Sequence, residues 1–245
     1  IFERSIKEAN VQVQADPQQV RVNGTATVDG TKTTLAMVEP IGGSDVTRER
    51  AISAQLDEAA RKKMGLVLDP VLTGLIKVEL KQMQDGGEKQ TIDLKDATLN
   101  LPWVGWSKGK GIPAKATFAM RSAKGVTYLD DFYIEGEGFS AVGKLTLDKG
   151  GLLSADFVNI SLNQDDSFSL KLARKGRNYK VDASGLRYDA RALLNRLFHE
   201  KGFGDEQGTS AITVTANIAE VGGYNGKVLR NVEMVYGAKG GWLDQ

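Results

Sequence analysis

The sequence predicts a mainly β protein, built as a long antiparallel meander sheet with two short amphipathic helices. Three observations support this prediction. Most of the 245 residues alternate apolar and polar side chains, which is the pattern of strands with one apolar face. Short glycine-rich turns separate these runs, and glycine accounts for 28 residues, about 11% against a usual ~7%. Helical spacing is confined to two segments, so alternating βα units and a parallel doubly wound sheet are not expected.

The alternation is clearest in four runs. In each of them the apolar side chains share one parity, and polar side chains such as Lys, Thr, Asn and Ser occupy the other. The apolar positions are Val20, Val22, Ala26 and Val28; Ile76, Val78 and Leu80; Phe168, Leu170 and Leu172; and Ile212, Val214, Ala216 and Ile218. Between 153–157 and 158–162 the apolar phase slips by one residue, which predicts a β-bulge near Phe157.

The turns between the runs carry the residues that tight hairpins need. Asp-Gly and Gly-Gly pairs tolerate the positive φ of these turns, so they predict hairpins between adjacent strands. Such turns are expected at Asp29-Gly30, Asp85-Gly86-Gly87, Lys124-Gly125, Lys149-Gly150-Gly151 and Lys175-Gly176.

Two segments show helical spacing instead. From Arg48 to Met64 the apolar residues recur at i, i+4, i+7, i+8 and i+12, and Gly65 follows as a stop. From Asp189 to Lys201 one apolar stripe is preceded by Asp189 as a cap and followed by Gly202. We expect both helices to pack on the sheet or to close one end of it. The stripes consist of Ile52, Leu56, Ala59, Ala60 and Met64, and of Leu193, Leu194, Leu197 and Phe198.

Composition excludes several classes of function. The 32 Lys and Arg nearly balance the 31 Asp and Glu, so the chain lacks the basic excess of a nucleic-acid-binding protein. With no cysteine and a single histidine, His199, it offers neither a thiolate metal site nor a pair of imidazoles. We expect no metal and no cofactor.

The chain ends and the apolar runs indicate the context of the chain. No run approaches the ~18–20 apolar residues of a membrane-spanning helix. The chain begins with Ile1 and Phe2, followed by charged residues, which is not the order of a signal peptide. We expect a single β-rich segment, residues 1–245, taken from a longer protein, with sub-units at 1–110 and 111–245.

Motifs that could carry chemistry are incomplete. The stretch from Gly105 to Lys110 has three rather than four residues before its Gly-Lys pair, so it does not fit a phosphate-binding loop. Gly136-Glu137-Gly138 is expected to be a bend. The acidic pairs Asp130-Asp131 and Asp165-Asp166 are expected to be turn or edge charges, because neighbours in a strand point to opposite faces. His199 is expected to lie near a helix end, where a cation suits the dipole. The protein is therefore expected not to be an enzyme.

Two of the three tryptophans, Trp103 and Trp106, lie close together. They could form a stacking platform for sugars, or they could cover one end of a sheet. The second interpretation is favoured. The first supports an alternative function, a structural or carbohydrate-binding β-module of an envelope or extracellular protein.

Three blocks of the sequence resemble the AsmA-like proteins, specifically the YhdP-like branch. The first runs from Leu56-Asp57 through Arg61, Met64-Gly65-Leu66-Val67-Leu68, Leu72 and Gly74. The second is Ile92 to Pro102, followed by Gly105-Trp106-Ser107-Lys108. The third runs from Leu129 through Gly138, Gly143, Leu145-Thr146-Leu147-Asp148 and Asp165-Asp166 to the helix start at 189–194. Each motif is degenerate, and their order and spacing over residues 50–200 carry the resemblance.

The resemblance implies a periplasmic protein, anchored in the inner membrane of a Gram-negative bacterium, that passes phospholipids between the inner and outer membranes. Its sheet would be curled into an open groove, whereas periodicity alone supports a closed sandwich equally well. The implied partners are phospholipid acyl chains, the membrane through other parts of the parent chain, and further envelope proteins, with no nucleic acid. Acyl chains would contact one apolar face, for which we expect Phe168, Leu170, Leu172, Val181, Ile212, Val214 and Ile218.

Overall fold

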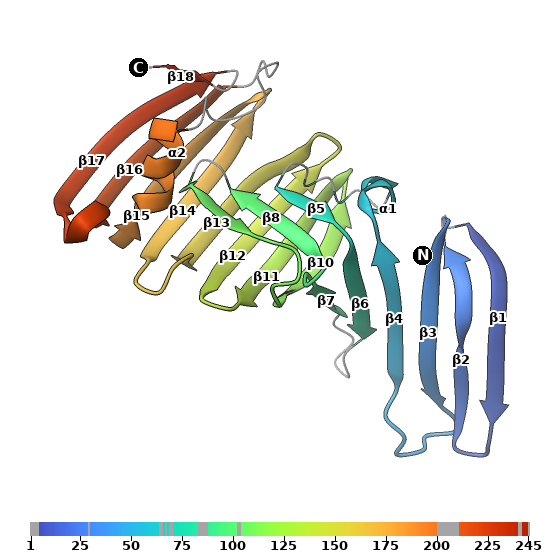
Figure 1. The fold of residues 1–245 in the computed structure, drawn as a ribbon. Helices are drawn as coiled ribbons and strands as arrows, with labels where there is room; N and C mark the ends of the chain where they lie inside the picture. Colours follow the sequence, from blue (N-terminus) through green and yellow to red (C-terminus); the bar gives the residue numbers. More distant parts are fainter. Residues whose placement is uncertain are drawn as a thin grey trace.

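The computed structural model describes residues 5–28, 30–63, 66, 68, 71–82, 88–101, 104–199, 211–239 and 242–244. These residues form a 15-stranded sheet and a smaller 3-stranded sheet (Figure 1). In spatial order the large sheet consists of β1 (Ile6–Ala15), β2 (Gln19–Val28), β3 (Thr31–Pro40), β4 (Glu49–Leu56), β6 (Ile76–Gln82), β7 (Glu88–Asp93), β10 (Ala114–Ala123), β11 (Val126–Gly136), β12 (Phe139–Asp148), β13 (Gly151–Ser161), β14 (Ser167–Lys175), β15 (Asn178–Asp189), β16 (Ala211–Gly222), β17 (Val228–Lys239) and β18 (Trp242–Asp244).

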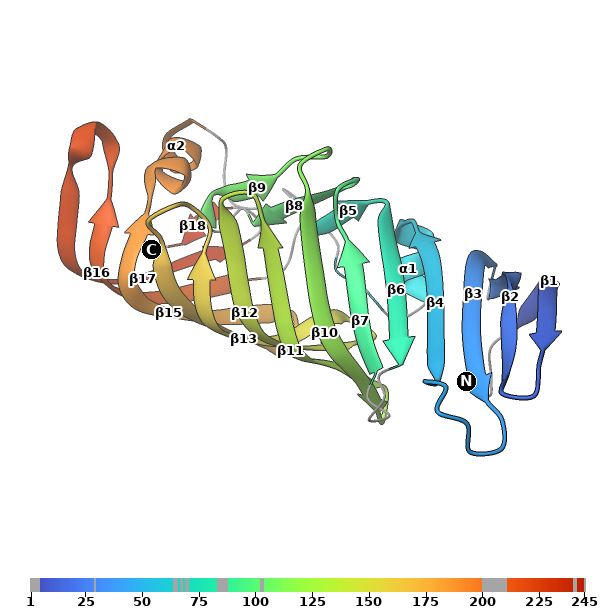
Figure 2. The same cartoon turned by 90° about the horizontal axis from the view of Figure 1, so that it is seen from below.

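Neighbouring strands of the large sheet are antiparallel except for β15 and β16, which are parallel. A parallel pair needs a crossover connection, and helix α2 (Arg191–His199) lies in the segment between these two strands. The sheet is curled but not closed, and its C-terminal strands bend round at the end opposite β1 (Figure 2). The prediction of a long, mainly antiparallel β meander with an open, curled sheet is thus confirmed.

The small sheet consists of β5 (Leu72–Gly74), β8 (Ala97–Leu101) and β9 (Trp106–Lys108). It lies across the middle strands of the large sheet (Figures 1 and 2). Leu72, Ala97 and Leu99 of the small sheet share one hydrophobic core with Ile92 and Phe118 of the large sheet. The fold is therefore sandwich-like over the middle strands, although the large sheet extends well beyond this cover.

The first predicted helix is wrong over most of its length. Residues 49–56 form strand β4, which pairs with β3 on one side and β6 on the other. The misreading has a physical reason: Ile52 and Leu56 fit a helical stripe, but with Ala54 they also form a period-two run that meets Val78 and Ile76 of β6. The helix that does form, α1, is short (Glu58–Lys63).

Each helix begins at an aspartate cap, of which Asp189 was predicted and Asp57 was not. Asp57 Oδ1 accepts a 2.8 Å hydrogen bond from the Ala60 amide at the start of α1. Helix α2 confirms the second predicted helix, and Asp189 Oδ1 accepts a 3.0 Å bond from the Arg191 amide. The proposed stops at Gly65 and Gly202, and Met64 and Lys201, lie outside the described residues.

The predicted bulge is also present. In the β12–β13 pair, Val142 is opposite Asn159 while Gly143 is opposite Phe157, so one extra residue is inserted after Phe157. Positive φ angles occur in the predicted turns at Lys124-Gly125, Gly151 and Gly176. Asp29 and the turn 85–87 lie outside the described residues.

Gly185 is required by a close approach between strands β14 and β15. A Cβ atom at this position would lie 2.4 Å from Phe168 Cα. Because this neighbour is a backbone atom, the two strands would have to move apart to relieve the clash. We predict that Gly185→Ala lowers the free energy of unfolding by about 1–3 kcal/mol. Gly109→Ala is the control, because a Cβ there meets nothing within 4 Å. Equal urea midpoints for the two variants would contradict the prediction.

Candidate functional site

One apolar face runs across the large sheet, on the side that packs against the small sheet; we call it the inner face. Residues paired in the register share a face, so the register can be followed from strand to strand. The cross-sheet row, defined by these pairings, is Val11–Gly24–Leu35–Ile52–Leu80–Gln90–Phe118. A second row starts at Ala116, two residues from Phe118 on the same face of β10. It continues across the sheet through Ala116–Ile134–Ala141–Ile160–Phe168–Gly185–Ile218–Val232. The inner face is thus continuous from β1 to β17.

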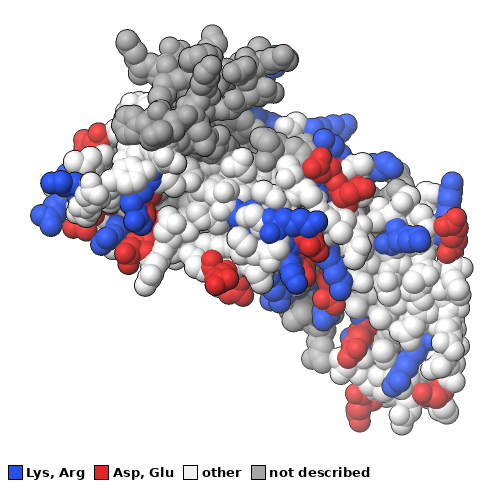
Figure 3. All heavy atoms as spheres, in the orientation of Figure 1, with Lys and Arg blue, Asp and Glu red and all other residues white. Residues whose placement is uncertain are grey.

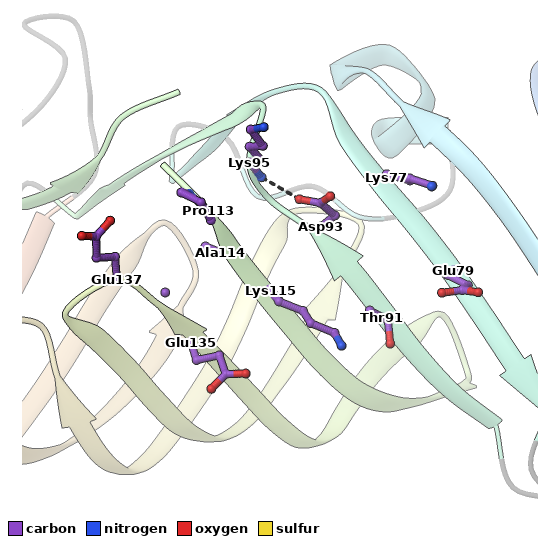
Figure 4. A pocket seen from close by; sticks show the side chains of 11 residues that line it. Lys77, Glu79, Thr91, Asp93, Lys95, Pro113, Ala114, Lys115, Glu135 and Glu137 are labelled. Carbon is purple, nitrogen blue, oxygen red and sulfur yellow. Dashed lines mark hydrogen bonds between the residues drawn. The ribbon is translucent and has the colours of Figure 1, made fainter. Parts of the chain in front are cut away.

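The opposite, outer face is largely polar. On β6, for example, Lys77, Glu79 and Lys81 alternate with the inner-face residues. A shallow hollow on this face is lined mainly by three lysines and four acidic residues (Figure 4). Because cationic and anionic side chains are mixed along its walls, the hollow has no single sign of charge that would select a ligand. These charged residues are Lys77, Lys95, Lys115, Glu79, Asp93, Glu135 and Glu137.

The residues predicted to face lipid are brought together on the inner face of β14, β15 and β16. Leu172 is opposite Val181, which is opposite Val214. The row through Phe168 passes by way of Gly185 to Ile218. All of the predicted residues are buried except Ile212, which is half-buried. They share a hydrophobic core with parts of the small sheet and the loop after β8, including Leu101, Val104 and Trp106. This part of the inner face is therefore already covered by protein.

The inner face of β1–β3 and of the first half of β4 is different, because no other layer covers most of it, whereas Leu56 at the end of β4 belongs to the core that includes the small sheet. Neither hydrophobic core of the described chain contains a residue of β1, β2 or β3. Val11 is 45% and Val13 60% exposed, and the side chains of Val20, Val22, Leu35, Met37 and Ile52 are half-buried. Ala26, on the same face of β2, is buried. In the view of Figure 3, uncharged residues predominate over β1–β4. We call this surface the open floor; it consists of Val11, Val13, Val20, Val22, Leu35, Met37 and Ile52.

The sequence contains a signal for the open floor, since Val11, Val13 and Ala15 alternate with Gln12 and Gln14. Alternation marks a one-sided strand but does not say what covers its apolar side. For that reason the predicted contact residues fell on the strongest alternating runs, near the C-terminus, rather than on the strands that the fold leaves uncovered.

Two buried cations fix the small sheet in place. Arg61 donates from its guanidinium to the carbonyl oxygens of Gly74 and Leu72, at 2.5 and 3.1 Å. Lys108 Nζ donates to Leu94 O and Ala97 O, at 2.5 and 2.7 Å. Burial lowers the pKa of Lys108 from its usual value. Both residues fall in the family-like blocks, and neither was predicted to have this role.

The glycine- and tryptophan-rich segment has a packing role. A Cβ on Gly105 would lie 2.4 Å from the Leu193 amide nitrogen, so this residue lets the segment approach helix α2. The ring of Trp106 packs edge-on against Phe139, with centroids 4.8 Å apart, and it is half-buried. Trp106 is therefore not a free stacking platform, while Trp103 lies outside the described residues.

The Asp165-Asp166 pair does not form an acid–base site. Asp166 is buried, and it accepts hydrogen bonds from the amides of Asp189 and Asn163, at 2.7 and 3.0 Å. Burial raises its pKa above the usual value. Asp165 is exposed and lies 3.8 Å from the Arg187 guanidinium. Asp166 thus connects the β13–β14 turn to the end of β15.

The other candidate polar groups are at the surface or at turns. Asp130 forms an ion pair with Arg121 at 2.6 Å, and Asp131 is exposed. Glu137-Gly138 forms the β11–β12 turn, as predicted. The side chain of His199 lies outside the described part of the chain.

No group of three or more His, Cys, Asp and Glu residues is placed to hold a metal ion in the part of the chain that the structure describes. In the same part, no helix has the length and apolar character needed to cross a membrane. Comparisons with protein-family models, curated proteins and solved structures found no match.

The open floor and the covered inner face should differ in their tolerance of truncation. Leu170 is buried in a core, so we predict that Leu170→Ala lowers the free energy of unfolding by about 2–5 kcal/mol. Leu35 is half-buried and packs against no second layer, so Leu35→Ala should lower it by less than about 1 kcal/mol. Urea denaturation of both variants measures the difference; similar losses would show that the open floor is covered.

Lys108 should contribute to the attachment of the small sheet. Lys108→Met removes the donor to two carbonyl groups, and we predict a loss of about 1.5–3 kcal/mol in the free energy of unfolding. Lys110→Met, at a nearby exposed position, is the matched control. If both variants were as stable as the parent, the buried ammonium would have no structural role.

Proposed function

We propose that this chain is a non-enzymatic segment of an AsmA-like protein of the YhdP-like branch, which binds phospholipids on its inner face and conducts them between the inner and outer membranes. In this proposal the parent protein is periplasmic and anchored in the inner membrane of a Gram-negative bacterium. The observation that carries the proposal is the open floor, an apolar part of the inner face of β1–β4 that neither hydrophobic core covers.

An apolar surface of this kind favours acyl chains as ligands. Removing apolar surface from water is favourable by about 25 cal/mol per Å², and this applies to the surface of the protein and to that of the acyl chain. From β1 to β6 the cross-sheet row crosses four strand spacings, roughly 19 Å at about 4.8 Å each. One leaflet of a bilayer contributes roughly 15 Å of hydrocarbon, half of a ~30 Å core. The row is thus long enough for one acyl chain lying across the strands.

Polar groups mark one end of the open floor. Arg50 lies on the inner face opposite Met37, and it forms an ion pair with Glu39, which also accepts a 2.8 Å hydrogen bond from Arg48. The hydrogen bond from Arg50 is the main reason that the pKa of Glu39 lies below its usual value. A head group would meet this wet rim while the chains lie on the apolar surface.

Conduction along such a face involves no chemical step. The cross-sheet row runs from Val11 to Phe118 without a charged side chain, and Arg50 and Glu39 lie beside it at the rim. A bound chain can therefore exchange one apolar contact for the next as it moves, and the head group stays in water at the edge.

Site-specific photocrosslinking tests the proposal. A benzophenone side chain is placed at Val22 or Leu35 on the inner face. The controls carry it at Asn23 or Ala36, the next residues in the sequence, which pair with each other on the outer face. After irradiation with vesicles of phosphatidylethanolamine and phosphatidylglycerol, we predict lipid adducts at Val22 and Leu35 in several-fold excess. Equal yields at the four positions, or no adduct at all, would contradict the proposal.

A further inference from the structure

Gln90 is an anomaly on the inner face. It is the polar member of the cross-sheet row, between Leu80 of β6 and Phe118 of β10. The residue is only 2% exposed. Neither Nε2 nor Oε1 of its amide has a hydrogen-bond partner, and these are the buried side-chain polar atoms left without one in the described part of the chain. Buried polar groups are almost always paired, so this amide requires an explanation.

The position of Gln90 in the row suggests one. Exposure falls along the row from Val11, at 45%, through half-buried Leu35 and Leu80, to Gln90 at 2% and Phe118 at 3%. Gln90 therefore lies where the exposed part of the inner face meets the part that is buried within the protein. An acyl chain that lay along the cross-sheet row on the open floor would have the end nearest β7 at this amide.

Gln90 is also close to the N-terminal end of its strand. Strand β7 begins at Glu88, two residues earlier, which corresponds to about 7 Å at ~3.4 Å per residue. A ligand group held at Gln90 can thus be joined to a second group that reaches water at the strand end. This arrangement fits an amphiphile whose polar head follows shortly after the group that Gln90 binds.

The chemistry of the amide narrows the class of group. Nε2 carries two N–H donors, and a hydrocarbon chain offers no acceptor to them. An ester carbonyl, at the junction of an acyl chain and its head, is an acceptor. In a surrounding of low polarity this hydrogen bond is strengthened, and leaving the donor unmet is correspondingly unfavourable.

We infer that Gln90 is a hydrogen-bonding site for the ester carbonyl of an acyl lipid, located at the inner end of the open floor. The inference rests on the proposed function and adds to it a ligand class: acyl esters bind in preference to hydrocarbon chains or ethers of the same length. The amide donates from Nε2 to the carbonyl oxygen, the chain runs outward along Leu80, Ile52 and Leu35, and the head group reaches the strand end.

The test compares two lipids on three proteins. The probes are a short-chain diester phosphatidylcholine and its diether analogue with identical chains, each below its micelle concentration, with binding followed by calorimetry. The proteins are the parent chain, Gln90→Met, which keeps a long unbranched side chain, and Gln55→Met, the same substitution at an exposed position on the outer face of β4. We expect the parent to bind the diester about five- to tenfold more tightly. Gln90→Met should lose that preference and Gln55→Met should keep it.

Other outcomes separate the inference from the proposed function. If the parent binds both lipids equally, or if Gln90→Met keeps the preference, the ester site is wrong while lipid binding stands. If the parent binds neither lipid, both are wrong. Thermal unfolding provides a second check: Gln90→Met should unfold at the same or a higher temperature, because it removes an unpaired buried amide. A clearly lower temperature would show that the amide is already satisfied within the protein and would overturn the inference.

Discussion

A sheet of fifteen strands with one apolar face must have that face removed from water, and this requirement governs the rest of the structure. The chain meets it in two ways over the middle and C-terminal strands. The small sheet lies across the middle strands and contributes Leu72 and Leu99 to their core. The loop after β8 and helix α2 cover strands nearer the C-terminus, where Gly105 approaches Leu193 closely.

Over the open floor the same requirement is not met by the described protein. The inner-face register continues without a break from Leu80 to Val11, but the second layer ends. The difference between the two regions is thus one of coverage and not of pattern. A ligand that supplies apolar surface would complete the layer, which is the physical content of the proposed lipid-binding function. The buried cations Arg61 and Lys108 hold the cover where it is, and so define where the open floor begins.

Local patterns in the sequence predicted the strands, the bulge after Phe157 and helix α2, because each depends on residues close together in the chain. The segment around Ile52 and Leu56 was misread because its spacing fits both periods, and pairing with distant strands decides between them. The parallel β15–β16 pair, the buried role of Lys108 and the orphan amide of Gln90 likewise depend on distant partners. Coverage was the hardest property to predict: β5 and β9 each have three residues, too few to show a period.

The central claim is that acyl chains occupy the inner face of β1–β4. Methyl NMR with a phospholipid that carries a nitroxide in its acyl chain measures this most directly, because the label broadens signals near it. The account predicts broadening of the methyl signals of Val22, Leu35 and Ile52, with little effect on Val142 and Val235. These two lie on the outer face, at 38% and 69% exposure, and report any non-specific adhesion of lipid. Broadening at Val142 and Val235 as strong as that on the open floor, or none on the open floor, would contradict the account.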